Sequence, residues 1–140
     1  MSMQDIVKQM LSAVPPGVTL DHATGVAEAY LTSLRHKDPV ARGQLFAENV
    51  TFEDPVGSRV LRGKAELQKF WQSFDTAPIE MDPRLDRVIV SGNEALMIFH
   101  MKTSLPGMGA VEIEIFETLR FDADGKIAEG RAFWDERCVK

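Results

Sequence analysis

The segment TFEDPVG, residues 51–57, brings together residue types that can move protons. Asp54 stands directly before a proline and close behind Phe52, and a positioned carboxylate can act as a general base. The pattern Asp-Pro-Val-Gly also fits a β-turn with aspartate at its first position, proline at its second and glycine at its fourth. By itself this segment therefore favours a structural turn, and a catalytic Asp54 requires partners elsewhere in the chain.

Glu117 interrupts the apolar face of a strand that is predicted from Ala110 to Phe121. Side chains alternate between the two faces of a strand, and the residues sharing the face of Glu117 are all apolar: Val111, Ile113, Ile115, Leu119 and Phe121. An ionised, unpaired carboxylate on this face would be costly. Glu117 should therefore be partnered, reach water or hold a proton through a raised pKa. The alternative is a β-bulge that turns Glu117 outward.

Tyr30 is the only tyrosine, and it lies in the apolar stripe of a helix predicted from Asp21 to Lys37. A tyrosine in such a stripe is usually a core residue with a satisfied hydroxyl. Read together with the two acids, however, it offers a third polar group. A carboxylate at a strand end, a tyrosine on a core-facing helix and an acid on an apolar strand face can converge on one cavity.

Two further strands carry candidate walls for that cavity. The strand predicted from Ala95 to Thr103 presents Met97, Phe99, Met101 and Thr103 on one face, which is either plain core or a mostly apolar lining. In the last strand, predicted from Ile127 to about Glu136, small residues precede an aromatic on one face: Ala128, Gly130, Ala132 and Trp134. This pattern leaves room for a flat ligand or for a closely packed helix.

The order of the elements predicts an α+β fold. Helices are expected in residues 1–14, 21–37, 38–46 and from Gly63 through Trp71, with an extended stretch at 50–53. The second half is predicted to be a meander with strands at 87–90, 95–103, 110–121 and 127–136. Helices followed by a meander indicate a strongly curved sheet wrapped around the helices, with a concave pocket between the layers.

The bulk composition limits the classes of function. With 140 residues and 44% hydrophobic content, the chain fits a single soluble domain over residues 1–140, in which 1–19 form an N-terminal extension. The net charge of −5 is dispersed, which argues against nucleic acid or membrane as partners. A lone cysteine, Cys138, and no signal pattern lead us to expect the cytoplasm. No metal-binding or nucleotide-binding motif occurs, so neither a metal nor a cofactor is expected.

The segment around Asp54 resembles that of a known protein family. The stretch LFAENVTFEDPVGSRVLRGKAELQKFW, residues 45–71, resembles the Δ5-3-ketosteroid isomerases of the NTF2-like (SnoaL-like) superfamily, and the likeness extends from about Ala23 to Glu136. It implies a cone in which N-terminal helices pack in a curved, mostly antiparallel sheet. It also implies that Asp54 is the base and that Tyr30 contributes to an oxyanion hole. Glu117 stands where the family has an aspartic acid, itself a known case of a carboxylic acid kept neutral in an apolar site.

The resemblance implies a steroid Δ-isomerase that moves a double bond into conjugation with a ketone, without a cofactor. The substrate would be a steroid or other polycyclic ketone, and the protein would be a homodimer. The expected substrate-binding residues are Phe52, Val56, Trp71, Met97, Phe99, Met101, Ala132 and Trp134. Two alternatives stay open, because the superfamily is functionally diverse. One is an enzyme of the polyketide cyclase or epoxide hydrolase type, and the other is a non-catalytic ligand-binding or interaction module.

Overall fold

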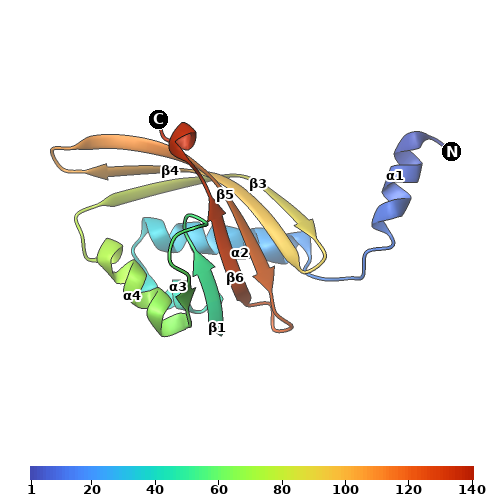
Figure 1. Cartoon of the computed structure of the whole chain (residues 1–140), viewed down its shortest axis with the longest axis horizontal. Coiled ribbons are helices and arrows are strands. Elements are labelled where there is room, and N and C mark those ends of the chain that lie inside the picture. Colours follow the sequence, from blue (N-terminus) through green and yellow to red (C-terminus); the bar gives the residue numbers. More distant parts are fainter.

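The computed structural model describes residues 1–140 and consists of one curled sheet with helices on its inner side (Figure 1). The helices are α1 (Met3–Leu11), α2 (Leu20–Arg35), α3 (Pro39–Gly43), α4 (Lys64–Asp75) and the short η1 (Glu136–Cys138). The strands are β1 (Phe46–Glu53), β2 (Leu61–Arg62), β3 (Glu80–Ser91), β4 (Glu94–Leu105), β5 (Gly109–Phe121) and β6 (Ile127–Phe133). The six strands lie in the order β2-β1-β6-β5-β4-β3. Only the β1–β6 pair is parallel, so the predicted α+β class is confirmed.

Helix α2 forms the inner layer against the sheet, and its apolar stripe is the one expected from the sequence. Its first turn is capped by the Thr19 hydroxyl, which accepts the His22 N–H at 3.1 Å. The residues it buries recur at helical spacing: Ala23, Val26, Ala27, Tyr30, Leu31, Ser33 and Leu34. In contrast, α1 buries no residue and stands away from the rest of the chain (Figure 1). None of the helices combines the length and the apolar character that a membrane crossing requires.

Several predicted boundaries are wrong. The third helix ends at Gly43, and β1 begins at Phe46 rather than residue 50, because the Leu45 carbonyl already accepts the Ile127 N–H at 2.9 Å and starts the pairing with β6. Strand β3 begins at Glu80 rather than residue 87. It is an edge strand, which tolerates Pro83, and a register shift before Arg87 breaks the alternation that would have revealed it.

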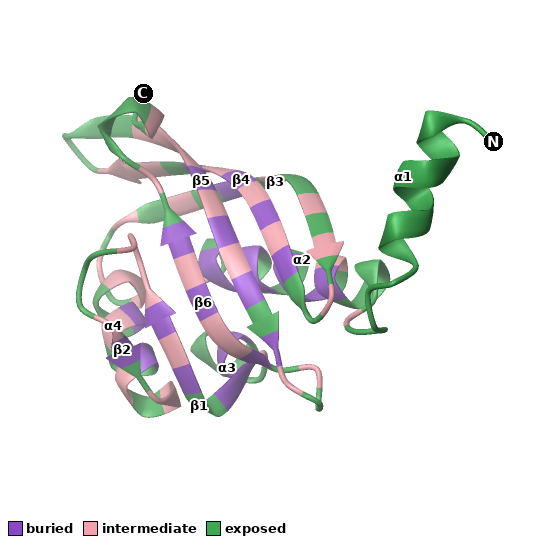
Figure 2. Cartoon of the chain, turned by 45° about the vertical axis from the view of Figure 1, so that its right-hand side comes forward, coloured by how far each residue is buried: buried purple, intermediate pink, exposed green.

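The alternation in β5 is confirmed, and it turns Glu117 inward. Glu117 pairs with Met97 of β4 and Ala132 of β6 in unbroken register. The shift between β5 and β6 lies further along, at Arg120 and Phe121, so no bulge reverses the face of Glu117. Figure 2 shows buried and partly buried residues alternating along these strands. Ala128 of β6 lies at that shift, where it has no partner on β5, and it is only partly buried. The prediction that Ala128 shares the inner face with Gly130 and Ala132 is therefore wrong.

A buried ion pair holds α3 and α4 in place below the sheet. The Arg42 guanidinium is fully buried and donates to both carboxylate oxygens of Asp75, at 2.9 and 3.0 Å. It also donates to the Ser33 hydroxyl at 3.1 Å and to the Ser33 carbonyl at 2.8 Å. Its carbon Cζ lies 5.0 Å from the ring centre of Trp71. One arginine therefore ties α2 to α4 and orients an aromatic ring.

We expect the Asp75→Ala substitution to lower the free energy of unfolding by about 3–5 kcal/mol, because it leaves the Arg42 charge buried without its partner. Urea denaturation followed by circular dichroism measures this loss. The matched control is Glu66→Ala, which removes an exposed pair in which Glu66 Oε1 lies 2.8 Å from Arg59 and should cost about 1 kcal/mol or less. Equal losses in the two variants would contradict a structural role for the buried pair.

Candidate active site

Asp54, Tyr30 and Glu117 come from three different elements and line one cavity. Asp54 follows the end of β1, Tyr30 lies on α2, and Glu117 lies on β5. The cavity has a volume of about 300 Å³, and 12 of the 15 residues around it are hydrophobic. The residues outside the hydrophobic class are Asp54, Glu117 and Thr103, and Tyr30 adds a hydroxyl. A few polar groups inside an otherwise apolar enclosure are the arrangement that binding and catalytic sites typically show. The convergence expected from the sequence is therefore present.

Glu117 is a buried acid whose surroundings favour its protonated form. Its exposed fraction is 1%, and its oxygen Oε2 has no hydrogen-bond partner. Burial raises the pKa of its carboxyl well above the ordinary value, and the neighbouring Asp54 carboxylate raises it further. Both effects favour the neutral carboxylic acid over the carboxylate. Such a group can donate a hydrogen bond to a ligand oxygen.

Asp54 is less buried than Glu117 and is held by a tryptophan. The Trp134 indole Nε1–H donates to Asp54 Oδ1 at 2.9 Å. Burial raises the pKa of Asp54, whereas this hydrogen bond lowers it because it stabilises the ionised form. The two effects oppose each other. Burial is the larger of the two effects, so the pKa of Asp54 is raised above its ordinary value. The hydrogen bond nevertheless makes the environment of Asp54 distinct from that of Glu117.

The turn after Asp54 differs from the one predicted. The Ser58 N–H donates to the Pro55 carbonyl at 3.0 Å, so the turn comprises residues 55–58, and Asp54 precedes it. The peptide bond between Asp54 and Pro55 is cis. The Val56 N–H donates to the Ala132 carbonyl at 2.8 Å and ties the turn to β6. Asp54 is therefore placed by the strand before it and by the turn after it, without itself being a turn residue.

Tyr30 is buried among aromatic rings. Its exposed fraction is 3%, and its ring centre lies 5.8 Å from that of Phe46 and 5.9 Å from that of Trp71. Burial raises the pKa of the Tyr30 hydroxyl well above its ordinary value, and the nearby Glu117 and Asp54 carboxyls add to this effect. The hydroxyl therefore keeps its proton, and it can serve as a second hydrogen-bond donor in the cavity.

The expected substrate-binding residues are divided between the cavity wall and the core behind it. The cavity is lined by four of them: Trp71, Phe99, Met101 and Trp134. Phe52, Met97 and Ala132 are almost completely buried but do not line it. Phe52 instead packs against Phe46 and Trp71, and it lies so close to Gly130 that a Cβ there would come within 2.7 Å of the Phe52 ring.

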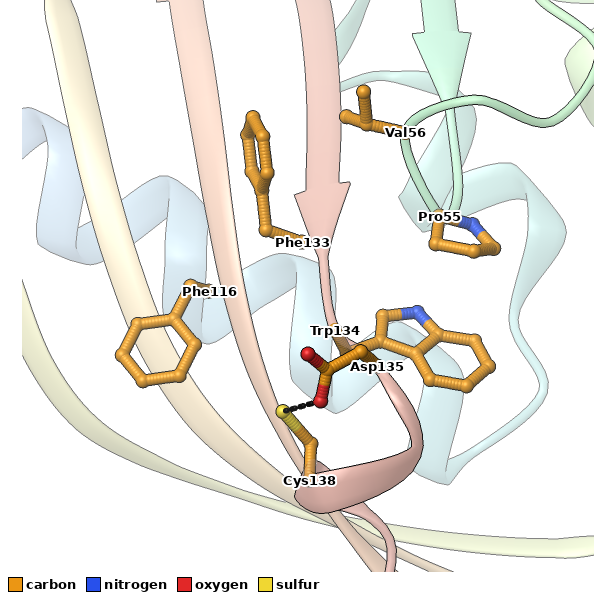
Figure 3. Close-up of a pocket in the computed structure, with 7 residues that line it drawn as sticks. All are labelled: Pro55, Val56, Phe116, Phe133, Trp134, Asp135 and Cys138. Atoms are coloured by element: carbon orange, nitrogen blue, oxygen red, sulfur yellow. Dashed lines mark hydrogen bonds between the residues drawn. The ribbon is translucent and has the colours of Figure 1, made fainter.

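Val56 lies elsewhere, in a hollow on the outer face of the sheet (Figure 3). This hollow, about 320 Å³ in volume, is lined by Pro55, Val56, Phe116, Phe133, Trp134, Asp135 and Cys138. Phe116 and Phe133 are cross-strand partners next to Glu117 and Ala132, so they project to the opposite face of the sheet. The structure thus separates Val56 from the acids.

Seven residues of the wall were not predicted from the sequence. They are Leu34, Phe70, Phe74, Ile79, Met81, Ile113 and Ile115. Strand parity could have identified Ile113 and Ile115, which share the face of Glu117, and helical spacing could have placed Leu34 one turn after Tyr30. Ile79 and Met81 carry no such signal, because they precede the expected start of their strand. No group of three or more His, Cys, Asp or Glu side chains is arranged to hold a metal ion.

Comparison with known proteins agrees with this geometry. Residues 27–130 match the SnoaL-like domain family. The chain belongs to this family. It is 31% identical over 105 residues to a steroid Delta-isomerase from Nocardioides simplex, an alignment that covers 75% of this chain and 83% of that relative.

Two solved structures show the same fold. Rv0760c from Mycobacterium tuberculosis, in complex with estradiol-17β-hemisuccinate, has a TM-score of 0.74 and 19% identity over 85% of this chain and 98% of its own. SalBIII, an epoxide hydrolase/cyclase-like enzyme with a role in pyran ring formation in salinomycin, has a TM-score of 0.72 and 24% identity over 83% and 92%. The predicted NTF2-like curled-sheet fold is therefore confirmed.

The buried proton of Glu117 predicts a pH dependence of stability. The folded state keeps a proton that the unfolded chain releases above the ordinary pKa of glutamate. The contribution of this proton to the free energy of unfolding is therefore fully present below that pKa. It falls as the pH rises above it, by at most about 1.4 kcal/mol per pH unit. Glu117→Gln removes this contribution, so its free energy of unfolding should decline less steeply between about pH 5 and 8.

Urea titrations at several pH values measure the slopes. The matched control is Glu28→Gln, an exposed glutamate of α2, which should keep the slope of the unmodified protein. If Glu117→Gln kept that slope as well, Glu117 would not carry a buried proton.

The indole of Trp134 should hold Asp54 in its ionised form. We expect Trp134→Phe to raise the pKa of Asp54, because a hydrogen bond that favours the carboxylate is lost. Carbon-13 NMR titration of the Asp54 carboxyl measures the change. Trp71→Phe is the control, since Trp71 lines the same cavity without bonding to Asp54. An unchanged or lowered pKa in Trp134→Phe would contradict this role.

Proposed function

We propose that this protein is a steroid Δ-isomerase-like enzyme, which moves a carbon–carbon double bond into conjugation with a ketone. The observation that supports this best is a neutral Glu117 with an unpaired oxygen, in the same apolar cavity as the Tyr30 hydroxyl and the Asp54 carboxylate. Its similarity to a steroid Delta-isomerase at 31% identity agrees with this reaction. The substrate class we propose is a steroid or a related polycyclic ketone.

In the proposed reaction, Asp54 transfers a proton from one carbon to another. Its carboxylate removes a proton from the carbon between the ketone and the double bond, and the electron pair moves onto the ketone oxygen to form a dienolate. The protonated Asp54 then returns the proton to the far end of the conjugated system. Reactant and product have the same atoms and oxidation state, so the step requires no co-reactant. A positioned carboxylate of this kind acts as a general base.

Tyr30 and Glu117 stabilise the dienolate. Both keep their protons in the cavity, so each can donate a hydrogen bond to the ketone oxygen. These bonds are stronger to the developing oxyanion than to the neutral ketone, and only such a difference accelerates the reaction. The apolar wall excludes water and thereby strengthens them. Glutamic acid has one methylene more than the family's aspartic acid, so its carboxyl extends further from the strand, in a contact that depends on geometry.

The cavity also supports an apolar, ring-shaped substrate. Its walls are formed by aromatic side chains such as Phe99 and Trp71, together with Met81 and Met101. Flat rings and flexible thioethers pack well against a rigid polycyclic ligand. The same fold accommodates a steroid derivative in the complex of Rv0760c.

A second candidate reaction uses the same pair of carboxyls. Glu117 could give its proton to an epoxide oxygen while Asp54 accepts a proton from the attacking hydroxyl or water. The observation that favours it is two acids in one cavity with different surroundings, since Asp54 accepts the Trp134 indole N–H and Glu117 Oε2 has no partner. SalBIII shows that an enzyme associated with such chemistry shares the fold. SalBIII is 24% identical to this chain, whereas the steroid Delta-isomerase is 31% identical, so we rank epoxide opening second.

The test is an ultraviolet assay for conjugation of a Δ5-3-ketosteroid, run on the purified protein and on Asp54→Asn. We expect the variant to lose a factor of about 10² to 10⁴ in kcat, because asparagine cannot accept the proton, while steroid binding persists. Binding is measured by quenching of tryptophan fluorescence, since Trp71 and Trp134 line the cavity.

The matched control is Glu53→Gln. Glu53 is the adjacent carboxylate, but it pairs with Arg131 at 3.3 Å and is not part of the cavity, so turnover should be kept. If the unmodified protein bound the steroid without converting it, the cavity would serve another reaction, with epoxide opening next in line. Absence of both binding and turnover would favour an interaction module.

A further inference from the structure

Besides Tyr30, Asp54 and Glu117, the cavity has a further polar side chain, which lies at the end opposite the two acids. Along β4 the inward side chains follow one another as Phe99, Met101 and Thr103, and all three line the cavity. Apart from Tyr30, Asp54, Glu117 and the two indoles, Thr103 is the only polar side chain of the wall. An apolar stretch therefore separates one hydroxyl from the catalytic groups.

The hydroxyl of Thr103 is free to bind a ligand. The threonine hydroxyls that form hydrogen bonds within the chain are those of Thr19, Thr76 and Thr118, and Thr103 is not among them. Its neighbours on the adjacent strands are apolar, Met81 on β3 and Val111 on β5. A hydroxyl can donate one hydrogen bond and accept two. Among these apolar neighbours, a ligand oxygen in the cavity offers Thr103 a partner.

The register of the sheet sets the span between the two polar ends. Thr103 pairs with Val111, whereas Glu117 pairs with Met97, so the two ends lie six residues apart along β5. At about 3.3 Å per residue this is about 20 Å along the backbone. Both side chains project into the concave side of a curled sheet, so their polar atoms lie closer together than their backbones. A small ketone cannot reach both ends, but a rigid ligand of several fused rings can.

We propose that Thr103 forms a second polar subsite, which selects polycyclic ligands that carry a hydroxyl or carbonyl at the end far from the reacting ketone. The orientation of the ligand rests on the proposed function, because the reacting end must face Tyr30, Asp54 and Glu117. Thr103 acts on binding and takes no part in the proton transfer. It therefore determines which ketone is accepted and leaves the rate of the chemical step unchanged.

The test uses two inert ligands, so that it does not depend on turnover. Estradiol carries a phenol at one end and a hydroxyl at the other, and its analogue lacking the hydroxyl on the five-membered ring is the comparison. Dissociation constants for both are measured by tryptophan quenching. The unmodified protein should bind estradiol about fivefold more tightly than the analogue, the effect of one hydrogen bond.

Three variants separate the hydroxyl from the packing. Thr103→Val keeps the shape but lacks the hydroxyl, and the ratio of the two dissociation constants should fall to about one. Thr103→Ser restores the hydroxyl and should restore the preference. Ser104→Ala, the next residue on the opposite face of β4, should bind like the unmodified protein.

An unchanged preference for estradiol in Thr103→Val would overturn the proposal. The proposal would also be wrong if the unmodified protein bound the two ligands equally well or bound neither. If the preference depends on Thr103 while Δ5-3-ketosteroids are not converted, the subsite stands and the proposed isomerase reaction fails. If Δ5-3-ketosteroids are converted but the preference does not depend on Thr103, the isomerase reaction stands. In that case only the proposed selection of ligands with an oxygen at the far end is wrong.

Discussion

A carboxyl group buried in an apolar cavity is the constraint around which the inner face of the sheet is arranged. The only charge that influences the pKa of Glu117 is that of Asp54, which has the same sign, so burial and this charge both favour the neutral form. Two ladders hold the residue in this position, through Met97 and Ala132, both of them fully buried. Turning Glu117 outward would shift β5 by one residue and expose its whole apolar face.

The position of Tyr30 depends on the helices, and these depend on a second buried charge. Arg42 binds Asp75 and Ser33 and lies over Trp71, which in turn packs against Tyr30. Unlike Glu117, Arg42 cannot lose its charge, so it is buried together with a bidentate partner. The two buried ionisable groups are thus accommodated in different ways, one by holding a proton and one by pairing. Both solutions contribute to the same cavity.

The fold alone does not determine the reaction. An enzyme associated with epoxide opening and a protein solved with a steroid derivative share this curled sheet, so the chemistry must come from the few polar groups inside it. Here those groups are two carboxyls with different environments and one tyrosine. Asp54 receives a hydrogen bond from Trp134, and Glu117 receives none at Oε2. The proposed roles of base and acid rest on this difference rather than on the overall shape.

The sequence by itself determined the stripe of α2 and most of the order of the elements, because these follow from local periodicities of 3.6 and 2 residues. It marked Glu117 by the alternation of its strand, but only the unbroken register with β4 and β6 excluded a bulge that would turn it outward. The sequence could not show which apolar residues line the cavity and which lie in the core behind it. Met97 and Phe99 share one face of β4, yet only Phe99 reaches the cavity. Nor could it place Val56 outside the sheet or begin β3 at Glu80. Those outcomes were decided by the tertiary structure, because the curvature of the sheet and the distance to α2 and α4 depend on contacts between residues far apart in the chain.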